Sequence, residues 1–489
     1  MQQVELLEGA GDLEPGPGPT PPRRRRRRWA VGSAAVAVLA LAGTQWVVDH
    51  REDAVRARLA AVPGVVPPPG DSLEVVRTLS PDEGEALWTG IDLGAASASV
   101  VVAEDGSRAL TATDTVSGGT VWSTPLLGPD AERAVPSSSS WGATCQGSAP
   151  SGRVSTFVAC LVTDGFQRID DDGAALVLPA PTASIEVLDP ADGHVVVRWP
   201  VEAGSPLAVL ADQLLVGHRD ARGIEVVAHD PRTGDERWRY AEPLVPDPGA
   251  SPGAAPERFW TFFAAGDVLA FSNGGALALL SSTGEKVRDD LRPGDGGRAF
   301  STDPTTGDLV MTVYAGTDDH ETTVLLSTDG DPGGDRMLDG RLLATVVDDG
   351  TVPGLVLTAD GRLHAWDRAT GRPRWTADVL PGDDALVVRG RVYVTTASSL
   401  VALDGRTGET DWETPADLGL GGPLATDGRH VLVPSTWGAA DGGRLTAYDL
   451  ATGAEVRRIP YPPGVTDVEA YEGLLMGWSD TSEEISVLD

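Results

Sequence analysis

The chain has 489 residues, 41% of them apolar and 22% charged, which is typical of a folded globular protein and excludes a fully disordered one. Its formal net charge of −34 argues against nucleic-acid binding by the main domain. The 59 glycines and 37 prolines predict short strands joined by tight turns rather than long helices. The basic residues are nearly all arginine, with Lys286 the only lysine, a bias typical of GC-rich bacterial genomes.

Residues 1–28 are rich in proline, glycine and acidic residues and end in six arginines, so we expect a disordered tail. The next segment, Trp29–Val48, has 20 residues without a charge, about the length that crosses a bilayer core. The arginines before it keep the N-terminus cytoplasmic by the positive-inside rule. The sequence therefore predicts a single-pass cell-membrane protein with an extracytoplasmic main domain. Residues 1–48 carry six arginines against four acids, a net +2, so the remainder carries −36.

A cleaved signal peptide is the alternative for this segment, because residues 40–42 (Ala-Leu-Ala) are an acceptable signal-peptidase site. The apolar character continues to Val48, which favours an uncleaved anchor. Residues 49–70 are expected to form a stalk and a Pro-rich linker. The outer domain is then expected to occupy residues 71–489.

One motif recurs through this domain: Asp, three residues, Gly, and a Trp four residues further on. Its full copies are Asp114, Gly118 and Trp122; Asp230, Gly234 and Trp238; Asp367, Gly371 and Trp375; and Asp404, Gly408 and Trp412. Variant copies have Asp189 and Gly193 with Trp199 displaced by two residues, and Asp449 and Gly453 with Arg457 in the Trp position. Degenerate copies lie at 279–284 and 326–330.

The spacing of this motif predicts a β-hairpin. The Asp carboxylate accepts backbone N–H bonds, Gly takes the positive-φ position, and Trp starts the returning strand with a large flat face. Neighbouring copies are 37, 41 or 45 residues apart, the length of a four-stranded propeller blade. We therefore expect an all-β propeller of about eight four-stranded blades, with seven to nine possible.

Ring closure is expected from the two ends of the domain. The last residues, 485–489, match the strand before a turn but have no return strand. Residues 73–77 can supply it, which would remove an open sheet edge.

The segments 229–238 (HDPRTGDERW), 366–375 (WDRATGRPRW) and 403–412 (LDGRTGETDW) resemble repeats of quinoprotein (PQQ-like) β-propellers, including outer-membrane assembly scaffolds. The resemblance covers about residues 71–489 and is specific for fold rather than for activity. It implies that the Trp residues dock each blade to the next.

Motifs for catalysis are scarce. The sequence has no GxSxG elbow, no P-loop and no paired metal-ligand histidines. Quinoprotein enzymes of the resembled family hold their quinone beside a disulfide between adjacent cysteines, and this chain has no adjacent cysteines. We therefore expect no cofactor and no catalytic residue. Two carboxylate-rich segments, 170–172 and 329–335, could bind calcium weakly, but we favour solvated loops.

Cys145 and Cys160 are the only cysteines. In a segment expected outside the cytoplasm, the pair indicates one hairpin-bridging disulfide, with two buried free thiols as the alternative.

The sequence thus favours a non-enzymatic, membrane-anchored propeller that acts as a binding or scaffold platform for proteins or cell-envelope components. We expect its partners to be the membrane and other envelope proteins, and no nucleic acid. A quinone-dependent dehydrogenase and a ligand sensor are the alternatives. Trp141 and Trp437, on expected loops, are the aromatic candidates for surface contact.

Overall fold

The computed structural model divides the chain into two compact units, Met1–Arg58 and Leu59–Asp489. It describes residues 57–79, 90–115, 117–130, 143–148, 154–169, 175–178, 182–210, 212–220, 222–245, 262–273, 276–291, 298–303, 306–314, 321–416, 424–435, 443–471, 473–479 and 484–489.

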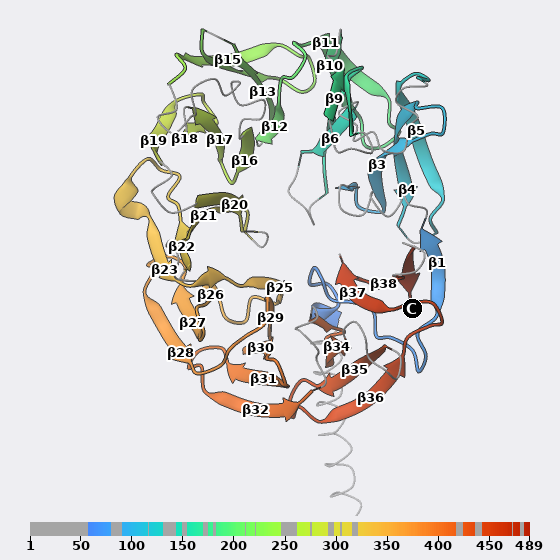
Figure 1. Ribbon diagram of the computed structural model, residues 1–489, viewed down its shortest axis with the longest axis vertical. Helices are drawn as coiled ribbons and strands as arrows, with labels where there is room; N and C mark the ends of the chain where they lie inside the picture. The colour runs from blue at the N-terminus through green and yellow to red at the C-terminus, as the bar shows by residue number, and fades with distance from the viewer. Residues whose placement is uncertain are drawn as a thin grey trace, which may run out of the picture. The chain divides into compact units, whose positions relative to one another are not determined.

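The unit Leu59–Asp489 is an all-β ring of nine sheets, each contributing one blade (Figure 1). In each blade the first strand faces the centre of the ring and the fourth lies at its rim. The all-β propeller is therefore confirmed, and its nine blades lie within the expected range of seven to nine, one more than the eight favoured.

The first three blades follow one another in sequence. Blade 1 contains β2 (Ile91–Asp92), β3 (Ala96–Val102), β4 (Arg108–Asp114) and β5 (Thr120–Leu127). Blade 2 contains β6 (Ala143–Gly147), β7 (Val158–Thr163), β10 (Ala183–Leu188) and β11 (Val195–Pro200), with a hairpin of β8 (Phe166–Ile169) and β9 (Ala175–Leu178) inserted between β7 and β10. Blade 3 contains β12 (Leu207–Leu210), β13 (Gln213–Arg219), β14 (Ile224–His229) and β15 (Glu236–Glu242).

The next three blades continue around the ring. Blade 4 contains β16 (Phe262–Ala265), β17 (Val268–Asn273), β18 (Ala276–Ser281) and β19 (Lys286–Leu291). Blade 5 contains β20 (Arg298–Thr302), β21 (Leu309–Tyr314), β22 (Glu321–Leu325) and β23 (Arg336–Asp339), with the 3-10 helix η1 (Pro332–Gly334) before β23. Blade 6 contains β24 (Arg341–Leu342), β26 (Leu355–Ala359), β27 (Leu363–Asp367) and β28 (Pro373–Ala377).

The last three blades complete it. Blade 7 contains β29 (Asp384–Val388), β30 (Arg391–Thr395), β31 (Ser399–Asp404) and β32 (Thr410–Pro415), and β25 (Ala344–Asp348) pairs in parallel with β29. Blade 8 contains β33 (Ala425–Thr426), β34 (His430–Pro434), β35 (Arg444–Asp449) and β36 (Glu455–Pro460). Blade 9 contains β37 (Asp467–Tyr471), β38 (Leu474–Trp478), β39 (Ile485–Leu488) and β1 (Val75–Leu79).

The ring closes through blade 9. Strand β1, from the start of the unit, pairs antiparallel with β39, from its end, and Thr78 lies opposite Ser486. The closure expected from residues 73–77 is therefore present, shifted by two residues along the chain.

The expected number of blades was one too low because the turns of blades 4 and 5 depart from the repeat motif. The turn between β18 and β19 has Ser281 where the motif has Asp, and the connection between β22 and β23 contains η1 instead of a tight turn. Both connections still join a third strand to a fourth, because the sheet needs the hairpin and not the carboxylate.

The hydrophobic core lies between blades. Each cluster of buried side chains draws on two neighbouring sheets: one contains Leu215 and Ala228 of blade 3 with Leu269 and Leu280 of blade 4. Alternate residues of the inner strands supply these side chains, as the period of two along a strand requires.

The two faces of the ring differ. Because the strands are antiparallel, the first–second and third–fourth turns of a blade emerge on one face, here called the turn face. These turns bond one another: Gly405 N–H donates to Gly390 O at 2.8 Å, and Leu450 N–H to Arg429 O at 3.2 Å. The outer strands end at the opposite face, here called the loop face, from which the chain passes to the next blade. Most of the connections after β5, β15 and β32, residues 131–142, 246–261 and 417–423, lie outside the described residues.

Residues 59–70 belong to this unit, although the sequence suggested a linker ending near Asp71. Val66 is buried and donates its N–H to Thr426 O at 2.9 Å, and Arg457 donates to Pro69 O at 2.5 Å. Prolines have no backbone N–H, so this extended stretch packs against the propeller with few donors to satisfy.

In the described part of the chain, no helix has the length and apolar character needed to cross a membrane. The predicted span Trp29–Val48 lies outside the described residues.

Candidate interaction surfaces

The four full repeat turns have the geometry that the motif predicts. At Asp367, the carboxylate Oδ1 accepts the Thr370 N–H at 3.0 Å, and Gly371, at φ 63°, donates its N–H to the Asp367 carbonyl at 2.7 Å. Arg374 and the Thr370 hydroxyl bond the same carboxylate and lower the pKa of Asp367. Both carboxylate oxygens of Asp367 thus accept hydrogen bonds from residues of the same hairpin.

The repeat tryptophans join each blade to the next. The indole N–H donates to a backbone carbonyl in the following blade's turn. These bonds run from Trp122 to Pro190 at 3.0 Å, Trp238 to Ser282 at 2.9 Å, Trp375 to Gly405 at 3.1 Å and Trp412 to Leu450 at 3.3 Å. The ring also covers the next turn's glycine: a Cβ at Gly408 would lie 2.5 Å from the Trp375 indole. These residues therefore hold the propeller together.

Arginine replaces tryptophan at four blade interfaces. Arg457 donates to Pro69 O and Gly70 O, Arg288 is bonded to Asp335 at 2.6 Å, and Arg336 donates to Ala369 O at 3.0 Å. Arg77 packs on Gly118. Only Arg457 was identified from the sequence, because Arg288 and Arg336 follow turns that lack part of the motif and Arg77 is in the closing strand β1, which follows no such turn.

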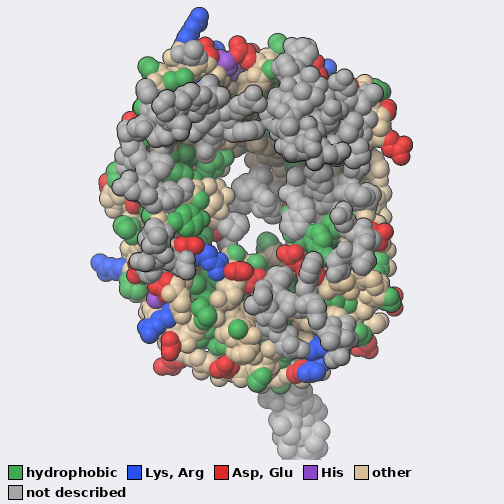
Figure 2. All heavy atoms as spheres, in the orientation of Figure 1, with side chains coloured by type: hydrophobic (Ala, Val, Ile, Leu, Met, Phe, Trp, Pro, Cys, Tyr) green, Lys and Arg blue, Asp and Glu red, His purple; other side chains and the backbone are tan. Residues whose placement is uncertain are grey.

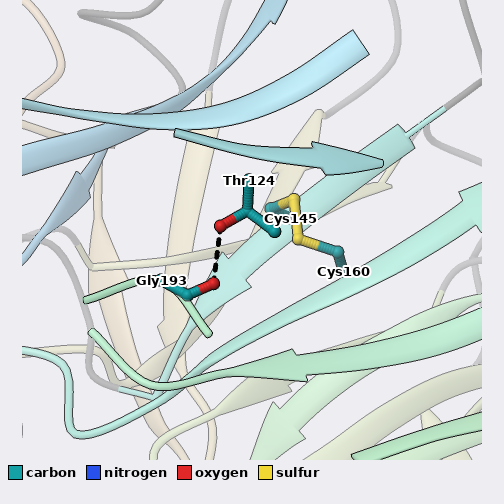
Figure 3. The surroundings of a disulfide bond; sticks show 4 residues. All are labelled: Thr124, Cys145, Cys160 and Gly193. Carbon is teal, nitrogen blue, oxygen red and sulfur yellow. Dashed lines mark hydrogen bonds between the residues drawn. A yellow bond between two sulfur atoms is a disulfide. The ribbon is translucent and has the colours of Figure 1, made fainter. Parts of the chain in front are cut away.

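The two cysteines form a disulfide with an S–S distance of 2.02 Å. Cys145 in β6 and Cys160 in β7 are directly opposite one another in blade 2. Figure 3 shows the disulfide near the Thr124 hydroxyl, which donates to Gly193 O at 2.5 Å across the interface between blades 1 and 2. The bond therefore fixes the inner part of one blade.

Three carboxylates lie on the first strands of blades 7 and 9. Asp384 is buried and accepts the Leu424 N–H at 3.0 Å. Burial raises the pKa of Asp384 to about 7, helped by the negative charges of Asp383 and Glu469. Burial also raises the pKa of Glu469 and of Asp467. Figure 2 shows acidic side chains around the hollow at the centre of the ring. No sequence motif marked these residues, because the first strands are short and lack the repeat.

A cavity of about 200 Å³ lies between blades 5 and 6 and the start of β25. Arg368 lines it and binds Asp303 at 2.7 Å and Asp308 at 2.6 Å. Asp348 also lines it, and burial raises the pKa of Asp348. Because the only arginine lining the cavity is already paired with two carboxylates, the cavity offers no uncompensated cation to an anionic ligand.

The carboxylates of the segment 329–335 each have a local partner. Asp329 accepts the Ser327 hydroxyl, Asp331 accepts the Gly333 N–H at 2.8 Å, and Asp335 accepts Arg288. Across the described ranges, no three His, Cys, Asp or Glu side chains are grouped to hold a metal ion. Residues 170–172, Trp141 and Trp437 lie outside those ranges.

A ring of nine four-stranded blades, joined through Asp–Gly turns and Trp or Arg docking, defines a β-propeller. The family model described as "Outer membrane protein assembly factor BamB" matches residues 295–472. Over these residues the repeats are similar to that family, in line with the resemblance to PQQ-like repeats, and the unit as a whole is a nine-bladed β-propeller.

Solved structures with similar folds include BamB from Moraxella catarrhalis, with 16% identity, a TM-score of 0.34 and coverage of 85% of this chain and 99% of that one. The dihydro-heme d1 dehydrogenase NirN, in complex with DHE, has 14% identity, a TM-score of 0.35 and coverage of 83% and 82%. A eukaryotic initiation factor has 10% identity, a TM-score of 0.40 and coverage of 76% and 89%. No curated protein matches the chain.

Proposed function

We propose that the chain is a non-enzymatic β-propeller, anchored in the cell membrane by Trp29–Val48, that binds other envelope proteins outside the cytoplasm. The observation that carries this proposal is the contrast between the two faces. On the turn face, turns of blades 7 and 8 are bonded to one another, whereas the connections from one blade to the next leave at the loop face. A rigid scaffold with one variable face suits protein recognition.

The name of the matching family supports a role among envelope proteins, since it describes an assembly factor of the outer membrane. The dehydrogenase alternative gains nothing from the disulfide, which joins two strands fifteen residues apart instead of adjacent cysteines. The disulfide of quinoprotein enzymes, between adjacent cysteines beside the quinone, therefore has no counterpart at Cys145 and Cys160.

Site-specific photocrosslinking in intact cells tests the proposal. Leu380, exposed in the connection from β28 to β29, lies on the loop face, and Thr407 lies in a tight turn on the turn face. We expect a crosslinker at position 380 to capture the same envelope protein repeatedly and one at position 407 to capture none. Capture from position 407 alone, or from neither position, contradicts the platform proposal.

A further inference from the structure

Outer strands of the propeller share a local irregularity. In eight blades, the strand at the rim contains a β-bulge residue near its start that the third strand skips. These bulge residues are Val76, Val121, Val196, Arg237, Val287, Arg374, Asp411 and Val456. Because each bulge lies near the start of its outer strand, it lies at the turn-face end of that strand.

Four consecutive blades, 8, 9, 1 and 2, have an exposed valine at this position. The exposed fractions are 52% for Val456, 61% for Val76, 54% for Val121 and 42% for Val196. We call these four residues the valine arc.

In blades 3, 6 and 7 the bulge residue is charged and paired within its own blade. Arg237 binds Asp230 at 2.7 Å, Arg374 binds Asp367 at 2.8 Å, and Asp411 binds Arg391. In blade 4, Val287 is half-buried. Exposed apolar bulges are therefore confined to one arc of the described rim.

The charge of the rim reverses along the same arc. The outer strands of blades 8, 9, 1 and 2 carry four arginines and one acid: Arg77, Arg198, Arg457, Arg458 and Glu455. The outer strands of the other five blades carry six basic and seven acidic residues. This edge of the rim is basic and apolar, whereas the domain as a whole is strongly acidic. Such an edge suits contact with a lipid bilayer, whose surface carries phosphate groups over an apolar interior.

The N-terminal segment enters the propeller at the same place. A Cβ at Gly428 in blade 8 would lie 3.1 Å from Leu59, and one at Gly473 in blade 9 would lie 3.3 Å from Val65 O. Both glycines are in first–second turns, on the turn face. From Val48 to Leu59 there are eleven Cα steps, which span at most about 40 Å even when fully extended.

We infer that the valine arc and its neighbouring arginines form the surface on which the propeller rests against the lipid bilayer. This inference rests on the proposed membrane anchor. The valines enter the headgroup layer, and the acidic remainder of the ring is repelled from the membrane. Arg198 and Arg458 are the exposed arginines of the arc, and each would exchange its carboxylate partner, Glu186 or Glu455, for a lipid phosphate. The contact thereby fixes the orientation of the ring.

Fluorescence quenching by brominated lipid tests this contact. The full chain is placed in vesicles of phosphatidylethanolamine and phosphatidylglycerol with brominated acyl chains. Because Cys145 and Cys160 are joined, Val121→Cys supplies one free thiol for a fluorophore. The matched control is Met337→Cys, an exposed apolar residue (71%) on the outer strand of blade 5, across the ring.

We expect the label at position 121 to be quenched several-fold more than the label at position 337. Equal quenching, in protein that floats with the vesicles, overturns the contact and leaves the anchor standing. Protein that does not float with the vesicles refutes the anchor itself, and the contact with it.

A second variant tests the valines. Adding Val76→Asp and Val456→Asp to the Val121→Cys protein should reduce quenching to the level of the control, with an unchanged circular dichroism spectrum. Undiminished quenching in the folded variant overturns the role assigned to the valine arc.

Discussion

Glycines in the repeat turns meet two separate demands. Gly408 has a φ of 73°, where any side chain is strained, and a Cβ there would also meet the Trp375 indole at 2.5 Å. Gly390 has a φ of 80°, but a Cβ there would meet no atom within 4 Å. Substitutions at Gly390 and Gly408 can therefore distinguish the cost of backbone strain from the cost of lost packing between blades.

Gly408→Ala should lower the free energy of unfolding by about 3 kcal/mol or more, because it adds displacement of Trp375 to the cost of a positive φ. Gly390→Ala should cost only about 1–2 kcal/mol, the strain alone. Urea denaturation of both variants measures the difference. Equal losses would show that the indole does not pack on the turn.

The pKa of Asp384 predicts a pH dependence of stability. Burial raises this pKa from 3.8 to about 7, so between these values the folded protein holds a proton that the unfolded chain releases. Stability from this group is present below pH 3.8 and is lost as the pH rises toward 7, by an amount on the order of 4 kcal/mol.

Asp384→Asn keeps an acceptor for the Leu424 N–H and removes the titration, so the variant should gain stability relative to the native chain at about pH 8 but not at about pH 4. Denaturation at the two values measures this, with Asp339→Asn, an exposed position, as the control. An Asp384→Asn effect that is the same at both pH values would contradict the raised pKa.

Individual strands and hairpins were the most predictable elements. Asp367, Gly371 and Trp375 specify a turn and a docking residue within nine positions, so local pattern alone identified them. Arg288 and Arg336 perform the same docking without a motif, because any long donor side chain that reaches the next turn serves. The carboxylates near the centre escaped detection for another reason: Asp384 and Glu469 come together only when blades 7 and 9 are in the ring.

The packing of residues 59–70, the segment before β1, could not be predicted from the sequence. Its prolines indicated a spacer, whereas Leu59, Val65 and Val66 are buried against blades 7 to 9. Apolar residues among prolines do not reveal their packing partner, which here lies about 360 residues further along the chain, at Thr426.

Val66→Asp should destabilise the protein by about 3 kcal/mol, because it places a charge at a position only 2% exposed. Val76→Asp, at 61% exposure, should change stability by less than about 1 kcal/mol. Thermal or urea unfolding compares them. Similar small effects would mean that residues 59–70 are a free linker after all.

At the scale of the molecule, the ring depends on joining its two ends. The repeat spacing predicted a propeller and its closing strand, since each blade must pair its third strand with a fourth. The blade number was underestimated because blades 4 and 5 keep the hairpin without its Asp. The degenerate marks at 279–284 and 326–330 do correspond to blades 4 and 5, and counting each as a full blade would have given nine.

Closure of the ring by β1 is the central structural claim, and a cysteine pair tests it directly. The Thr78 and Ser486 side-chain oxygens lie 3.5 Å apart although the residues are 408 positions apart in sequence. Thr78→Cys with Ser486→Cys should form a second disulfide on mild oxidation, seen as the loss of both alkylatable thiols and as halves held together after cleavage of a connecting loop. Each single variant should keep one free thiol. If the double variant keeps both thiols free while folded, β1 does not close the ring.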